Sequence, residues 1–151
     1  MTTQRSVARK YDPRLAARSL ARKLALQALY RWQINDSPWQ DVIGEFETDT
    51  DMPKADREYF GILIAGVCAG SEALDAAISI FAERTAAGLD PIERAVLLLS
   101  VFELRHRPDV PYKVVINEAV NLARRFGATD GHKFVNAVLD RAARELRSAE
   151  L

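Results

Sequence analysis

Residues 89–104 read LDPIERAVLLLSVFEL, and this stretch decides the fold. It opens as a helix start, because Asp90 can cap, Pro91 suits the first helical position, and Glu93 lies where a capping-box carboxylate reaches back. The residues that follow are apolar on every side of the helix rather than along one stripe. We therefore predict a central helix that is buried all round and ends before Pro108.

Helical spacing of apolar residues continues on the N-terminal side of this stretch. A first helix is expected over residues 13–34, after the capping residue Asp12, and a short second helix begins after Ser37-Pro38. A third helical stretch covers about residues 55–87 and contains Gly66 and Gly70. Glycine destabilises a helix interior, so we expect either a close helix crossing or a break there, and the stretch is one helix or two.

Two more helices are expected on the C-terminal side. Pro111 opens the first, which ends at Gly127 with a left-handed stop, and the last helix follows Thr129-Asp130. No segment shows sustained period-two alternation. The sequence thus predicts an all-α fold of six to seven helices in two small packed bundles, one covering about residues 13–87 and the other about 89–148.

Composition limits the class of protein. The chain has 151 residues, 48% of them apolar, and no apolar run approaches the roughly 20 residues that a membrane-spanning helix needs. We expect a cytoplasmic, soluble protein without a signal peptide. One cysteine, Cys68, excludes an internal disulfide framework, and with His106 and His132 it makes no ordinary zinc site.

The net charge of zero conceals an asymmetry along the chain. Residues 1–35 carry eight basic groups and one acidic group, residues 36–93 carry three basic and thirteen acidic, and residues 94–151 carry ten basic and seven acidic, which gives +7, −10 and +3. This distribution favours a polyanion at one surface and a basic partner at another. Residues 1–12 are expected to form a flexible basic N-terminal extension.

Basic residues also follow the periodicity of the first helix. Arg14, Arg18 and Arg22 recur every four residues, and no acidic residue lies between Pro13 and Asn35 to pair with them. We interpret these arginines as an exposed stripe that tracks a phosphate backbone, at which alanine is tolerated. An ordinary solvated helix face is the alternative.

Signals of catalysis are weak. The pattern Gly66-x-x-x-Gly70 lacks the Lys-Ser or Lys-Thr of a phosphate-binding loop, and it is typical of helix packing. Cys68 lies in an apolar region, which favours a buried thiol. We expect no enzyme activity, no cofactor and no metal.

A second nucleic-acid signal is Asp130-Gly131-His132-Lys133-Phe134-Val135-Asn136. Phe134 lies off the predicted buried stripe of the last helix, beside Lys133 and His132. An off-face aromatic next to a cation suits base stacking with a phosphate contact nearby. Packing of Phe134 against another helix is the alternative.

Several blocks of the sequence, in chain order, are those of a known family. They are ALQALYRWQ at 25–33, PIERA at 91–95, FEL at 102–104, DVPYKVVINEA at 109–119 and HKFVNAVLD at 132–140. Over about residues 18–145 the chain resembles the bacterial NusB transcription antitermination factors. The resemblance implies a two-bundle all-α fold over a single domain at residues 13–151, and no catalytic activity.

The same resemblance implies a function and partners. Family members bind the boxA element of nascent RNA together with NusE, a ribosomal protein of the small subunit. With other Nus factors they help RNA polymerase to read through terminators, notably on rRNA operons. The resemblance also implies RNA-contacting residues, which are Arg18, Arg22, Tyr112, Phe126, Lys133 and Phe134.

Three further positions carry roles implied by the resemblance. Asp130 tempers RNA affinity by repelling phosphate. Tyr30 and Glu93 match family positions that are important for antitermination; we expect them to be partner-binding residues, and contact with RNA or with each other is the alternative. Two other functions remain open: a protein-interaction module that keeps the fold without binding RNA, and a free-standing relative of the N-terminal domain of rRNA cytosine methyltransferases. The methyltransferases need a further α/β domain with a glycine-rich loop, which this sequence does not contain.

Overall fold

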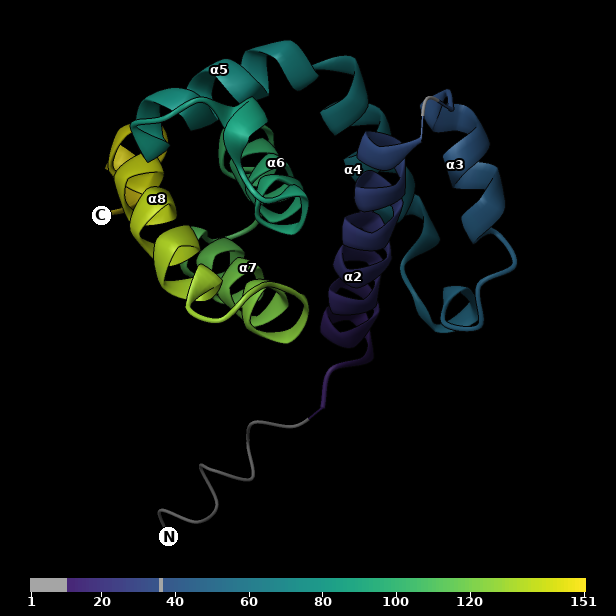
Figure 1. The fold of residues 1–151 in the computed structure, drawn as a ribbon. Coiled ribbons are helices and arrows are strands. Elements are labelled where there is room, and N and C mark those ends of the chain that lie inside the picture. The colour runs from purple at the N-terminus through teal and green to yellow at the C-terminus, as the bar shows by residue number, and fades with distance from the viewer. Residues whose placement is uncertain (1–10, 36) are drawn as a thin grey trace, which may run out of the picture.

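The computed structural model describes residues 11–35 and 37–151, and within them the chain forms seven α-helices and no strand (Figure 1). The predicted all-α fold is confirmed. Most of the predicted N-terminal extension lies outside the described residues. The helices are α2 (Pro13–Ile34), α3 (Trp39–Phe46), α4 (Arg57–Ala69), α5 (Ser71–Ala82), α6 (Pro91–His106), α7 (Tyr112–Phe126) and α8 (Gly131–Leu146), with short 3-10 turns η1 (Met52–Lys54), η2 (Ala86–Gly88) and η3 (Ser148–Glu150).

Local capping explains where α6 begins. Asp90 Oδ2 accepts hydrogen bonds from the N–H groups of Ile92 and Glu93, at 3.0 and 3.1 Å. The predicted start is therefore confirmed. The predicted capping box is wrong at this helix start. The carboxylate of Glu93 lies against Gly131 of α8 instead, since a Cβ added at Gly131 would come within 2.7 Å of Glu93 Oε2.

The stretch over residues 55–87 contains two helices. α4 and α5 are bent by 80° at the break, which falls at Gly70. At Gly66 the helix passes close to α6, since a Cβ at that position would overlap the ring of Phe102. The structure therefore has both a close crossing and a break. Among the described residues no single helix is long and apolar enough to span a membrane. α4 and α5 reach that length and apolar content only when taken together, as a bent pair.

Backbone in the left-handed region lies at positions other than the predicted one. Gly127 follows α7 with extended backbone, at φ −89° and ψ −179°, so the left-handed stop is wrong. Glycine suits this position because a Cβ would approach the carbonyl oxygen of Ala123 to 2.7 Å. Glu83 after α5 (φ 57°) and Asp130 before α8 (φ 65°) take the left-handed conformation.

The helices pack into two bundles that share α6. α2, α3 and α4 form one group, and α6, α7 and α8 form the other. α5 packs mainly on α6 and α8, although the prediction places residues up to about 87 in the first bundle. α2 and α4 also pack against α6, and one apolar core runs through both groups.

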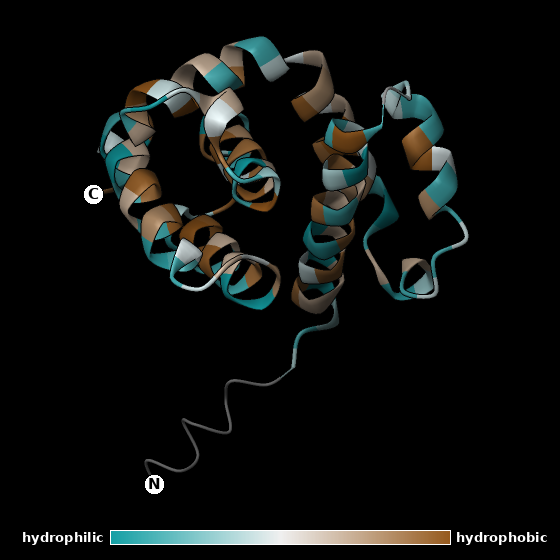
Figure 2. Cartoon of the chain, in the orientation of Figure 1, coloured by the Kyte–Doolittle hydropathy of each residue, from teal (hydrophilic) through white to brown (hydrophobic). Residues whose placement is uncertain are grey.

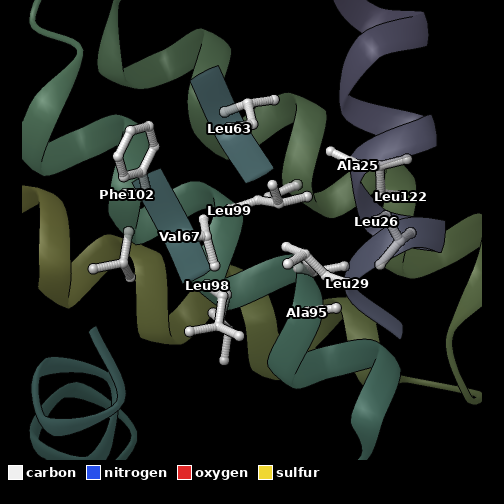
Figure 3. Packing of buried hydrophobic residues seen from close by; sticks show 14 of the residues in the cluster. Ala25, Leu26, Leu29, Leu63, Val67, Ala95, Leu98, Leu99, Phe102 and Leu122 are labelled. Carbon is white, nitrogen blue, oxygen red and sulfur yellow. The ribbon is translucent and has the colours of Figure 1, made fainter. Parts of the chain in front are cut away.

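The centre of this core is the helix that the sequence places there. Figure 3 shows Ala95, Leu98, Leu99 and Phe102 of α6 among side chains of α2, α4 and α7. Leu97 and Leu98 are fully buried. By contrast, α7 and α8 carry hydrophobic and hydrophilic residues on different sides (Figure 2), with the apolar side turned into the core. Their polar sides and their ends are the parts left for binding.

Candidate nucleic-acid interface

The three arginines of α2 lie in different environments. The side chain of Arg14 is 93% exposed, that of Arg18 is 31% exposed, and that of Arg22 is only 5% exposed. The predicted exposed stripe is therefore wrong at Arg22, and so is the prediction that alanine is tolerated at this position. Its acidic partners come from other helices, which explains why α2 itself contains none.

Arg22 belongs to a buried polar network between the bundles. Its Nε and Nη2 each donate to Glu103 of α6 at 2.9 Å, and Nη1 donates to Glu118 of α7 at 3.1 Å. Burial lowers the pKa of Arg22, but the hydrogen bond and charge of Glu103 outweigh it and raise that pKa overall. Tyr59 of α4 also donates its hydroxyl to Glu103. Arg22 thus holds helices together and lies away from solvent.

Arg18 remains accessible and is held in place by neighbours. Its guanidinium lies 4.1 Å from the ring centroid of Tyr59, within cation–π range. Its Nε is 3.8 Å from Asp56 and its Nη1 is 3.7 Å from Asp109. These distances are long for ion pairs. An anion reaching this surface therefore meets an oriented guanidinium with hydrogen-bonding capacity left.

The structure brings Tyr30 and Phe126 into one pocket. The pocket has a volume of about 450 Å³ and lies between α2, the end of α3, the start of α6 and the end of α7. Tyr30 is 39% exposed, and the guanidinium of Arg125 lies 5.0 Å from the ring of Phe126. The residues that line the pocket are Leu26, Gln27, Tyr30, Arg31, Phe46, Asp49, Ile92 and Phe126.

The start of α8 gathers most of the other predicted residues. The ammonium of Lys133 is 3.3 Å from Asp130 Oδ1, and both side chains are exposed. Glu93, which is 9% exposed, lies against Gly131 in the same region. Burial and the charge of Asp90 raise the pKa of Glu93, which the nearby charge of Arg84 opposes.

Phe134 packs on the core, which agrees with the alternative prediction, and a further residue covers it. Its ring is half-buried against the core, and the guanidinium of Arg84 covers it at 4.2 Å from the centroid. Arg84 comes from the loop between α5 and α6 and is exposed. Sequence reasoning missed Arg84, because no local pattern links it to a phenylalanine so far along the chain.

Tyr112 lies apart from this group. It begins α7, where its N–H donates to the carboxylate of Glu150 at 3.1 Å. A helix of 15 residues is about 22 Å long, so Tyr112 and Phe126 stand at opposite ends of α7. The structure thus groups Tyr30 with Phe126 in one pocket, and places Glu93, Asp130, Lys133 and Phe134 at the start of α8. Arg18, Arg22 and Tyr112 lie elsewhere.

Two observations in the described part of the chain concern metal binding and thiol reactivity. No three His, Cys, Asp or Glu side chains are placed there to hold a metal ion. Burial raises the pKa of the Cys68 thiol to about 12, so the thiol is protonated at neutral pH.

The fold and these surfaces define a class: an all-α, two-bundle protein that displays basic and aromatic side chains at its helix ends. The NusB family matches residues 19–144, and the chain belongs to that family. The transcription antitermination protein NusB of Teredinibacter turnerae is 53% identical over 140 residues, which covers 89% of this chain and 92% of that protein. The Hahella chejuensis protein of the same name is 48% identical and covers 89% and 90%.

Solved structures agree with this assignment. NusB of T. maritima superimposes with a TM-score of 0.74 at 30% identity, over 90% of this chain and 93% of that one. NusB in a complex of the antitermination factors NusB and NusE with double-stranded RNA has a TM-score of 0.66 at 25% identity, over 83% and 95%. These relatives carry the name of a transcription factor and not of an enzyme.

Proposed function

We propose that the protein is a non-enzymatic transcription antitermination factor that binds boxA-type single-stranded RNA together with NusE. In this role it acts in the cytoplasm with other Nus factors and helps RNA polymerase to read through terminators, especially on rRNA operons. The observation that carries the proposal is the surface at the ends of α7 and α8, where Phe126, Lys133 and Phe134 lie beside Arg84 and Arg125. Family membership supports it.

The RNA contacts follow from side-chain chemistry. Lys133 and Arg18 contact phosphates, because both are cations with at least part of the side chain in solvent. Phe126 and Phe134 provide the apolar surface near the bases. Asp130 tempers affinity, since it holds the Lys133 ammonium and repels phosphate. We leave Arg22 out because it is buried. Arg18 lies near Asp109, toward the end of α7 where Tyr112 stands, so these two residues form a separate part of the proposed RNA path.

The partner surface adjoins the RNA surface, because Tyr30 lines the same pocket as Phe126. Tyr30 lines the 450 Å³ pocket, and Glu93 follows Ile92, which lines it too. A carboxylate beside an apolar pocket suits a basic protein that inserts an apolar side chain. We assign this surface to NusE.

A titration with RNA tests the function. The full chain is titrated with a fluorescent boxA RNA and with a scrambled RNA of equal length, each with and without NusE. We expect preferential binding of boxA RNA that strengthens when NusE is present. Binding of NusE without any effect on RNA would instead identify a protein-interaction module.

A further inference from the structure

Arg84 lies between the ring of Phe134 and solvent. The guanidinium carbon is 4.2 Å from the ring centroid, well within the range of a cation–π contact. Phe134 is half-buried against the core, whereas Arg84 is exposed. A ligand that approaches this part of α8 therefore meets the guanidinium before it meets the ring.

The loop that carries Arg84 is fixed by its own hydrogen bonds. Glu83 takes the left-handed conformation and ends α5. The N–H of Arg84 donates to the carbonyl of Ser79 at 3.2 Å, and the N–H of Ala86 donates to the hydroxyl of Ser79 at 2.9 Å. The backbone of Arg84 is thus held against the end of α5, and the stack on Phe134 is formed before any ligand arrives.

We propose that Arg84 is an RNA-contacting residue and that a nucleobase stacks on the outer face of its guanidinium, in a base–Arg84–Phe134 sandwich. This inference rests on the proposed RNA-binding function and names a residue that the family resemblance did not supply. A guanidinium is planar and weakly hydrated, and it stacks on aromatic rings and on unpaired bases. Both of its faces are then used, one by Phe134 and one by the base.

Nearby charges favour stacking on Arg84 over an alternative in which Arg84 acts as a lid that swings away from the Phe134 ring when RNA binds. Arg84 acts electrostatically on Glu93, whose pKa its charge lowers against the effect of burial. If Arg84 swung away to bare the Phe134 ring, Glu93 would lose that compensating charge. Stacking on the guanidinium leaves both interactions in place. Lys133, one residue before Phe134, remains free to follow the phosphate of the stacked nucleotide once Asp130 releases it.

Four variants of the full chain test the sandwich in the presence of NusE: Arg84→Ala, Arg84→Lys, Phe134→Leu and the double variant Arg84→Ala/Phe134→Leu. We expect Arg84→Ala to weaken boxA RNA binding about tenfold, the effect of one lost base stack. Arg84→Lys keeps the positive charge but lacks the planar guanidinium, so its RNA affinity should be only slightly higher than that of Arg84→Ala. The fold-loss of RNA affinity in the double variant should be much smaller than the product of the fold-losses in the two single variants, because both substitutions remove the same stack.

A matched control separates stacking from general charge. Arg144→Ala removes another exposed arginine, about 15 Å from Phe134 along α8, and should leave RNA affinity nearly unchanged. Thermal unfolding of each variant checks that the fold is intact. Tighter binding by Arg84→Ala identifies a lid and overturns the proposal, as does wild-type affinity of Arg84→Ala or Arg84→Lys. Failure of the wild-type protein to bind RNA refutes the proposed function itself, which this set of variants distinguishes from failure of the sandwich.

Discussion

Arg22 and Glu103 form a bidentate ion pair inside the protein, with Nε and Nη2 of the guanidinium each 2.9 Å from a carboxylate oxygen. The pair joins α2 to α6 and so connects the two bundles. Both side chains are at most 5% exposed. An arginine that the sequence places on a binding surface is therefore part of the interior.

Replacement of Arg22 by alanine should destabilise the protein strongly. It leaves the Glu103 carboxylate buried without its main partner, and breaking such a pair costs about 3 to 5 kcal/mol. Urea unfolding of Arg22→Ala measures this loss. Arg14→Ala is the control, because its side chain is 93% exposed and a surface change of this kind stays within about 0.5 kcal/mol. Equal stability of the two variants would contradict the buried network.

Arg18 should contribute to the salt dependence of RNA binding. If its guanidinium contacts one phosphate, Arg18→Ala lowers the slope of log affinity against log salt by about 0.7. Arg18→Lys should restore most of the slope, since a lysine also neutralises a phosphate. Titrations at several salt concentrations provide the slopes, and an unchanged slope for Arg18→Ala removes this residue from the interface.

Phe134→Ala should affect binding more than folding. The ring is half-buried, so its loss costs less than the roughly 3 to 5 kcal/mol of a fully buried phenylalanine. RNA affinity should fall by about 1 to 3 kcal/mol, because the support of the stack disappears. Lys133→Ala is compared with it and should weaken all RNA sequences alike. A large fall in melting temperature with wild-type RNA affinity would place Phe134 in the core only.

Glu93→Gln should weaken binding to NusE. The substitution keeps the shape of the side chain and removes the negative charge that the proposed function assigns to recognition of a basic partner, an effect expressed mainly in the association rate. Stopped-flow or surface-based kinetics with NusE measure it at low and moderate salt. Glu72→Gln, an exposed change on α5, is the control. Identical association rates for Glu93→Gln and wild type would take Glu93 out of the interface.

Glu93 should also make stability depend on pH. Burial raises its pKa in the folded protein above the ordinary value of about 4.5. Between the two pKa values the folded state binds more protons than the unfolded state, so this contribution favours folding at low pH and is lost as pH rises through the folded pKa. Glu93→Gln should match wild type below about pH 4 and have the higher melting temperature at pH 7. A lower melting temperature of Glu93→Gln than of wild type at pH 7 would contradict this prediction.

The sequence by itself determines the helical class of this protein, several helix starts and the identity of the central helix. Helix starts at Asp12 and Asp90 are local, because the capping carboxylate and the amides that it binds lie two or three residues apart. The burial of α6 is local too, since its apolar residues leave no face for solvent. The sequence motifs of the family, such as residues 109–119, can likewise be identified from the sequence alone.

Only the tertiary structure decides which of these side chains meet. Arg22 is buried because Glu103 and Glu118 reach it from α6 and α7, and Phe134 is covered because the loop after α5 places Arg84 over it. α5 packs more on α6 and α8 than on α4, its neighbour in the sequence. The physical reason is the same in each case: helical periodicity and caps act within a few residues, whereas burial, ion pairing and stacking depend on groups that only the packed fold brings within reach.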